Sequence, residues 1–205
     1  DLQSLYQQVV AQQPTQLPAR TTSVKDWRLA LQRHARSTDL QKEMAYWQAQ
    51  LLDVSAELPR DNPAGGLQNR YARSLHCGLD KATTRQLLQD APRAYRTQVN
   101  DLLLTALARV ITRWTGQAHA LVQLEGHGRE ELMGADLTRT VGWFTSVFPL
   151  KLTPSGELGA SIRQVKEQLR AIPEKGIGFG VLRYLGDAAT QQTLAQLPVP
   201  RITFN

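Results

Sequence analysis

Cysteine is almost absent from this sequence, which has one, Cys77, among 205 residues. A single cysteine excludes an internal disulfide framework, and no pair of Cys or His residues has the spacing of a structural zinc site. No stretch approaches the roughly 20 apolar residues that a membrane-crossing helix needs. Residue 1 opens directly into an amphipathic pattern, without the layout of a signal peptide. These absences predict a cytoplasmic protein with no membrane partner.

Blocks of like charge are missing as well. The chain carries 24 Lys and Arg against 18 Asp and Glu, a formal charge of +6, but the basic residues are scattered. This pattern argues against a nucleic-acid partner, whereas a mildly basic surface suits an acidic protein partner. The 41% of hydrophobic residues is enough for a sizeable core in a chain of this length.

Helical periodicity dominates the first 60 residues. It predicts helices over residues 1–10 and Val24–Arg36, and a third that is capped by Thr38 or Asp39 and continues to residue 51. Pro14 and Pro18 lie in the loop between the first two helices. The segment DNPAGGLQ, residues 61–68, has Pro and paired Gly, which predicts a mobile loop.

Strands are predicted where apolar residues alternate or form short runs. Alternation from Asn69 to Asp80 predicts one strand, after which Asp80 caps a helix. Val99–Trp114 is apolar around most of its circumference and predicts a central buried helix, ended by Gly116. Further predicted elements are strands over Ala118–Glu125, Trp143–Leu152 and Ile202–Asn205, and a helix over Leu158–Ala171. This order predicts an α/β fold of the α+β type, a mixed sheet with packed helices.

Glu125 is the strongest candidate for chemistry, because it ends an apolar strand and a sharp turn through Gly126 and Gly128 follows. A carboxyl group held against apolar neighbours has a raised pKa and can both accept and donate a proton near neutrality. The alternative interpretation is a structural ion pair of Glu125 with Arg129 or Arg139.

Three further segments have both a structural and a functional interpretation. His127 has no partner at metal-ligand spacing, which favours turn packing or a hydrogen bond to the backbone. The segment Asp136–Leu152 is predicted to be part of the hydrophobic core, so Trp143 is expected to be buried. Lys175–Leu185 has three alternate glycines that let another chain or a ligand approach its backbone, or it forms a flexible loop.

Four segments in this order, EGHGRE, RTVGWFTSVFPL, GIGFGVLRYL and ITFN, resemble the successive motifs of the epimerization domains of nonribosomal peptide synthetases, in the condensation-domain superfamily. The resemblance extends to LPARTTSVKDW, to Tyr46 and Trp47, and to VNDLLLTAL. It implies a chloramphenicol acetyltransferase-like domain of two lobes with a tunnel between them. Residues 1–60 would be the helical end of the first lobe and the connection, and residues 69–205 the second lobe, truncated at its C-terminus.

The resemblance also implies a reaction, the L-to-D epimerization of the α-carbon of an aminoacyl or peptidyl thioester on a peptidyl carrier protein. Glu125 matches one of the two acid–base groups, and Asn205 matches an active-site asparagine. The other acid–base group is a histidine of an HHxxxDG motif, which this sequence lacks. We therefore expect an interior fragment that is inactive alone.

The resemblance implies no cofactor of the domain's own, because the phosphopantetheine arm of the carrier presents the substrate. Adjacent synthetase domains are the other implied partners. Two alternatives stay open. One is a condensation domain, which forms amide bonds, and the other is a degenerate domain that only binds carrier proteins.

Overall fold

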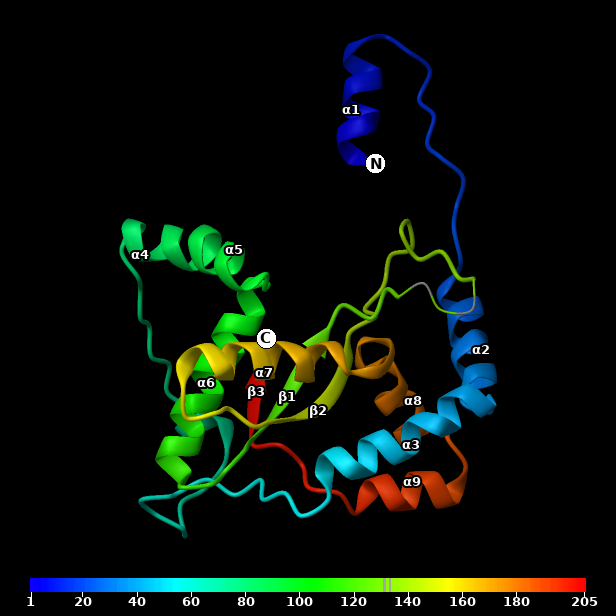
Figure 1. Cartoon of the computed structure of the whole chain (residues 1–205). Coiled ribbons are helices and arrows are strands. Elements are labelled where there is room, and N and C mark those ends of the chain that lie inside the picture. The colour runs from blue at the N-terminus through cyan, green and yellow to red at the C-terminus, as the bar shows by residue number, and fades with distance from the viewer. Residues whose placement is uncertain (131, 133) are drawn as a thin grey trace.

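The computed structural model describes residues 1–130, 132 and 134–205 (Figure 1). The helices are α1 (Leu2–Val10), α2 (Val24–His34), α3 (Thr38–Leu51), α4 (Lys81–Arg85), α5 (Ala91–Tyr95), α6 (Val99–Thr115), α7 (Leu158–Arg170), α8 (Ile177–Leu185) and α9 (Ala188–Ala195). Short helical turns are η1 (Asn69–Tyr71), η2 (Gln86–Asp90) and η3 (Pro173–Gly176), and the strands are β1 (Ala120–Gly126), β2 (Ser146–Leu152) and β3 (Ile202–Phe204).

The helix starts follow from short polar side chains that accept hydrogen bonds from the first turn. Ser23 caps α2 by accepting from the backbone N–H of Asp26, and Asp80 caps α4 by accepting from that of Thr83. The cap of α3 is Ser37 rather than Thr38 or Asp39, because the Ser37 hydroxyl is the group that accepts a backbone N–H. Gly116, at φ 70°, ends α6 as the sequence predicts.

The three strands form one mixed sheet in the order β2-β1-β3, which confirms the sheet type expected from the sequence. Strand β1 pairs antiparallel with β2, from Ala120 opposite Leu152 to Gly126 opposite Ser146. It pairs in parallel with β3, from Val122 beside Ile202 to Leu124 beside Phe204. Helix α6 contacts β1 and α7, whereas α3 and α8 pack on β2 (Figure 1).

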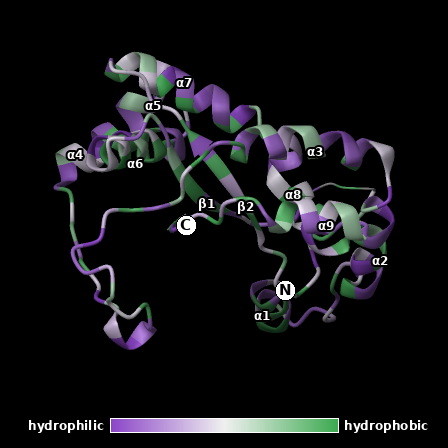
Figure 2. Ribbon diagram, turned by 90° about the horizontal axis from the view of Figure 1, so that it is seen from below, coloured by the Kyte–Doolittle hydropathy of each residue, from purple (hydrophilic) through white to green (hydrophobic). Residues whose placement is uncertain are grey.

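The main hydrophobic core joins the inner face of the sheet to these helices. It contains Val122 and Leu150 from the strands, Trp47 from α3, Ala108 from α6 and Leu182 from α8, all with no exposed surface. Both strands are mainly hydrophobic and are interrupted by single hydrophilic residues such as Gln123 and Lys151 (Figure 2). Helix α1, in contrast, stands apart and has no buried residue (Figure 1). An ion pair of Asp1 with Arg139 links it to the rest.

The strand predicted over Asn69–Asp80 is wrong. Only the turn η1 is regular there, residues 72–80 have no regular secondary structure, and Leu75 is 93% exposed. Alternation alone does not make a strand, since a strand also needs a neighbour for its backbone N–H and C=O groups. No described strand pairs with residues 72–79.

Three other expectations need correction. Strand β2 begins at Ser146, not Trp143, and Trp143 is 92% exposed instead of buried in the core. The flexible loop considered for Lys175–Leu185 is the helix α8, preceded by the turn η3. Helix α6 is buried on one side only, because Val110 and Trp114 are exposed. In each case an apolar or glycine-rich pattern was compatible with more than one environment.

Candidate active site

Glu125 lies near the end of β1, directly opposite Val147 of β2. Its neighbours Val122 and Leu124 point into the core, so by the alternation of a strand Glu125 is on the other face of the sheet together with Gln123. Glu125 and Val147 are both exposed, whereas the sequence predicted a carboxyl group surrounded by apolar side chains. That apolar enclosure is not present among the described residues.

Asn205 follows the last residue of β3. Because β1 and β3 are parallel, both strands have their C-terminal ends on the same side of the sheet, where Glu125 also lies. The parallel ladder pairs Gln123 with Thr203 and Leu124 with Phe204, where it ends. Glu125 and Asn205 are the residues that directly follow this last pair on the two strands. The side-chain amide of Gln123 donates to Oγ1 of Thr203 at 3.4 Å, which shows that these paired residues share a face. The two residues singled out from the sequence therefore converge at adjacent strand ends.

The turn after Glu125 is held by its own side chains. Nδ1 of His127 accepts the backbone N–H of Arg129 at 2.9 Å, which confirms the backbone hydrogen bond predicted for this histidine. Its Nε2 is 3.4 Å from a carboxylate oxygen of Glu130, and the other oxygen of Glu130 is 2.7 Å from Nζ of Lys175. The turn is thereby attached to the residues just before α8.

Gly128 brings the turn against the segment that leads into β2. Its φ is 65°, and a Cβ at this position would lie 1.6 Å from the carbonyl oxygen of Phe144. Only glycine combines this backbone conformation with so close an approach. Gly126 is similarly close to the hydroxyl of Ser146, which a Cβ would meet at 2.7 Å.

Arg129 organises the loop between the turn and β2, a role that the sequence alone did not indicate. Its Nη1 donates to the carbonyls of Leu137 and Thr140 at 2.6 and 2.9 Å, and its Nη2 to that of Gly142 at 3.2 Å. The guanidinium carbon lies 4.4 Å from the ring centroid of Phe144. The one signal in the sequence was the position of Arg129 within EGHGRE.

The structural ion pair considered for Glu125 is not formed. The guanidinium group of Arg129 donates its hydrogen bonds to backbone carbonyls, and Arg139 forms an ion pair with Asp1 at 2.9 Å. Among the described residues, every other side chain of EGHGRE that can form a polar contact has one, and no hydrogen bond or ion pair engages the carboxylate of Glu125. Glu125 is therefore the group of this motif that is available to a substrate.

Two hollows share lining residues near the strand end that carries Glu125, although Glu125 itself lines neither. One, of about 620 Å³, is mainly apolar and is lined by α2, the start of β2 and α8. The other, of about 140 Å³, lies over Gln123 and Pro149 and is closed by residues 197–200. Val147, which is opposite Glu125 in the ladder, and Tyr184 of α8 line both hollows.

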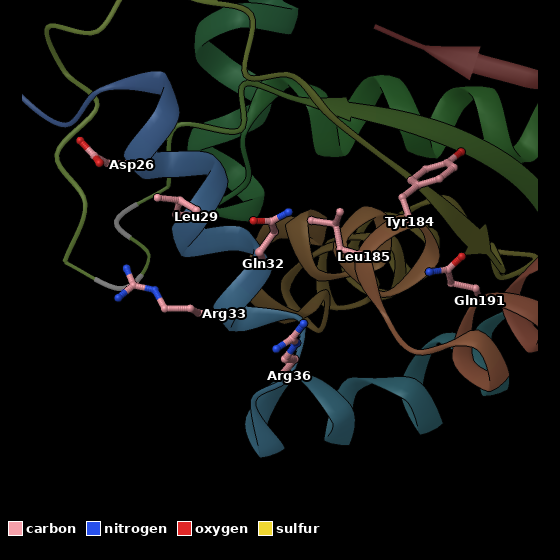
Figure 3. A pocket seen from close by; sticks show the side chains of 8 residues that line it. All are labelled: Asp26, Leu29, Gln32, Arg33, Arg36, Tyr184, Leu185 and Gln191. Atoms are coloured by element: carbon pink, nitrogen blue, oxygen red, sulfur yellow. The ribbon is translucent and has the colours of Figure 1, made fainter.

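A third hollow, of about 800 Å³, lies farther along α8 between α2 and α9 (Figure 3). Its lining is more polar, and it includes the exposed side chains of Arg33 and Arg36. Tyr184 and Leu185 separate it from the apolar hollow beside β2. No residue of EGHGRE lines it, so its arginines are not placed to act with Glu125.

A second carboxyl group with a perturbed environment is Glu43 of α3. Burial raises its pKa, although the indole N–H of Trp47 donates to it at 3.1 Å. Burial also raises the pKa of Tyr46 to about 12. A Cβ on Gly178 would lie 2.1 Å from an oxygen of Glu43, which confirms the close backbone approach that the glycines of α8 suggested. These contacts serve the packing of α3 on α8.

The described part of the chain holds neither a metal-binding cluster nor a membrane-spanning helix. Within residues 1–130, 132 and 134–205, no three His, Cys, Asp or Glu residues are grouped so that they could bind a metal ion. No helix of the same residues has the length and apolar character needed to cross a membrane.

Comparison with known sequences places these features in a family. A family model described as the condensation domain matches residues 1–205. A linear gramicidin synthase protein of Brevibacillus parabrevis is 46% identical over 211 residues, and the chondramide synthase of Chondromyces crocatus is 47% identical over 212 residues. The matches take in all of this chain but only 3% and 5% of those two proteins.

Solved structures give the same result. The epimerization domain from the third module of tyrocidine synthetase B superposes with a TM-score of 0.84 at 40% identity, over 99% of this chain and 46% of that one. The first condensation domain of the calcium-dependent antibiotic synthetase superposes with a TM-score of 0.65 at 20% identity, over 91% of this chain and 42% of that one. The second likeness is one of fold.

Proposed function

Because the chain belongs to the condensation-domain family of nonribosomal peptide synthetases, we propose that it is part of an epimerization domain, which inverts the α-carbon of a carrier-bound aminoacyl or peptidyl thioester. The likeness in fold agrees with the chloramphenicol acetyltransferase-like fold that the sequence implied. The 40% identity to a solved epimerization domain favours epimerization over the amide-bond formation of the condensation domains, whose identity is near 20%.

The observation that carries the proposal is the state of Glu125 within its motif. The other polar side chains of EGHGRE hold the turn and the loop beside it, whereas the carboxylate of Glu125 is exposed at the strand end. A carboxylate without a hydrogen bond or an ion pair does not help to hold the turn, so stability does not explain a glutamate at this position. A proton-transfer group needs this arrangement, namely a rigid backbone and an accessible carboxylate.

The proposed chemistry is an isomerisation and needs no oxidant or cofactor of the domain. A carboxylate at Glu125 removes the α-proton, and the electron pair left on carbon moves onto the thioester carbonyl oxygen to give an enolate. A second acid returns a proton to the opposite face of the α-carbon. The side-chain amide of Asn205, which like Glu125 directly follows the last pair of the parallel ladder, can donate a hydrogen bond to the enolate oxygen, where charge develops.

The partners follow from this reaction. The thioester would arrive on the phosphopantetheine arm of a peptidyl carrier protein, and neighbouring synthetase domains would supply and use the product. The histidine of the HHxxxDG motif, which would serve as the second acid in the family that the sequence resembles, is not among these 205 residues. We therefore expect residues 1–205 alone to leave a carrier-loaded substrate unconverted.

The test is the substitution Glu125→Gln in the synthetase that contains this chain. It keeps the shape of the side chain but removes the carboxyl group that would accept the α-proton. A positioned acid or base contributes about 10² to 10⁴ in rate. We expect a loss of that order in L-to-D conversion at an unchanged melting temperature. The matched control is Glu167→Gln on α7, where the carboxylate makes only an exposed ion pair with Arg170.

The wash-out of an α-deuterium label separates the alternatives. A base on one face of the α-carbon should lose more activity toward one enantiomer than toward the other when Glu125 becomes Gln. Equal and near-native wash-out from both enantiomers would remove Glu125 from the mechanism. Amide formation without any exchange of the α-hydrogen would identify a condensation domain, and carrier binding without either reaction would identify a degenerate one.

A further inference from the structure

We propose that Arg129 is a positioning residue for this site, because it folds residues 137–144 around its guanidinium group and so fixes the strand ends where Glu125 lies. The effect on the reaction rate rests on the proposed function of Glu125. The effect on the two strand ends does not rest on it. The two can therefore be tested separately.

The contacts of Arg129 require a guanidinium group. It donates to the carbonyls of Leu137, Thr140 and Gly142 through two different nitrogens, at 2.6, 2.9 and 3.2 Å, and the group lies over the ring of Phe144. A lysine carries its charge on one nitrogen and has neither the planar fork nor the stacking surface. Replacing arginine by lysine therefore keeps the charge and loses the arrangement.

The loop held by Arg129 leads directly into the ladder that positions Glu125. Phe144, over which the guanidinium lies, is two residues before Ser146, the first residue of β2. Ser146 pairs with Gly126 at the end of the ladder, and Val147 pairs with Glu125. The ladder ends at the pair of Gly126 with Ser146, so its last step depends on the Arg129 loop and on the close approach of Gly128 to Phe144.

The same loop presents two exposed apolar side chains. Val141 is 95% exposed, Trp143 is 92% exposed, and both flank Gly142, whose carbonyl accepts from Arg129. Side chains with so little burial do not hold a loop in place by packing. Burial of Leu137 beside Trp27 and Ile177 holds the start of this segment. The part around Gly142 depends on hydrogen bonds, and Arg129 donates three to the segment.

The experiment compares Arg129→Lys and Arg129→Ala in the synthetase that contains this chain, with Arg113→Lys on the exposed side of α6 as the matched control. For each variant we would measure the melting temperature, kcat and KM for a loaded carrier, and amide hydrogen exchange at residues 144–147. We expect Arg129→Lys to lower kcat about 100-fold with little change in KM, since a displacement of about 1 Å can cost that much. Exchange at Ser146 and Val147 should rise.

Millimolar guanidinium should restore part of the rate of Arg129→Ala, because it can occupy the space between the three carbonyls. If Arg129→Ala does not fold, Arg129→Lys carries the test alone. A native kcat and native exchange in Arg129→Lys would overturn the inference. A large loss of kcat with native exchange would also overturn it, because Arg129 would then act on the substrate directly.

Failure of the proposed function gives a different result. If Glu125→Gln is fully active while Arg129→Lys raises exchange at Ser146 and Val147, the role of Arg129 at the strand ends stands and the assignment of Glu125 falls. If Glu125→Gln is inactive while Arg129→Lys is native by both measurements, the assignment of Glu125 stands and that of Arg129 falls.

Discussion

Gly128→Ala should destabilise the fold far more than Gly116→Ala, although both glycines have a left-handed backbone. Their φ angles are 65° and 70°, so an added methyl group brings the same backbone strain to each, about 1 to 2 kcal/mol. Alanine also restricts the unfolded chain at each position by the same amount, about 0.4 to 1 kcal/mol in the stabilising direction. These contributions cancel in the comparison.

The difference between the two variants is therefore the steric contact alone. Around Gly116 a Cβ would meet nothing within 4 Å, whereas at Gly128 it would lie 1.6 Å from the carbonyl oxygen of Phe144. A backbone oxygen cannot rotate away as a side chain can, so the loop must move. Overpacking of this kind costs about 1 to 3 kcal/mol. We expect Gly128→Ala to be the less stable variant by that amount.

Urea denaturation of the two variants measures this difference, from the shift of the midpoint at constant m-value. In a chain of this size a difference of about 1 to 3 kcal/mol corresponds to about 2 to 12 °C in melting temperature. Equal free energies of unfolding would show that the turn does not press against Phe144. The close fit of the EGHGRE turn around Gly128 would then be refuted.

Three further predictions concern single side chains. Trp143→Ala should change the free energy of unfolding by no more than about 0.5 kcal/mol in urea, because the side chain is 92% exposed. Trp47→Ala should cost about 3 to 5 kcal/mol in the same assay, because the indole is fully buried between aromatic rings. Burial raises the pKa of Glu43 in the folded chain, so the native protein loses stability as pH rises from the ordinary carboxyl range through that raised value. The stability of Glu43→Gln relative to the native chain should therefore increase as the pH rises above the ordinary carboxyl range. A difference that does not change with pH would show that burial does not raise this pKa.

Local signals were enough to predict most helices. The caps of α2 and α4, the stop of α6 at Gly116 and the period of α7 each depend on residues within one or two turns of one another. The register of the sheet is different in kind. Nothing near Glu125 in sequence indicates that Leu124 pairs with Phe204, the residue before Asn205, and that relation came from the parallel ladder.

The errors arose where distant groups decide the structure. Leu75 alternates with polar neighbours as in a strand, but pairing needs a second strand. Trp143 is apolar, but its side chain is exposed, and the backbone beside it is held by a hydrogen bond from Arg129 to Gly142. The glycines of α8 have poor helix propensity, but Gly178 lets the helix pack against Glu43, and tertiary packing overrides propensity.

The parallel pairing of β3 with β1 also sets the order of events during synthesis. Gln123 and Thr203, which pair across the two strands, are 80 residues apart, whereas β1 and β2 form an antiparallel pair much closer in sequence. At about 5 to 20 residues per second, a ribosome needs about 4 to 16 s to add those residues. During that interval β1 has an unpaired edge, which is the kind of surface that other chains and chaperones bind. The pairing of β1 with β3, which leads to Asn205, can therefore form only after the pairing of β1 with β2 has become possible.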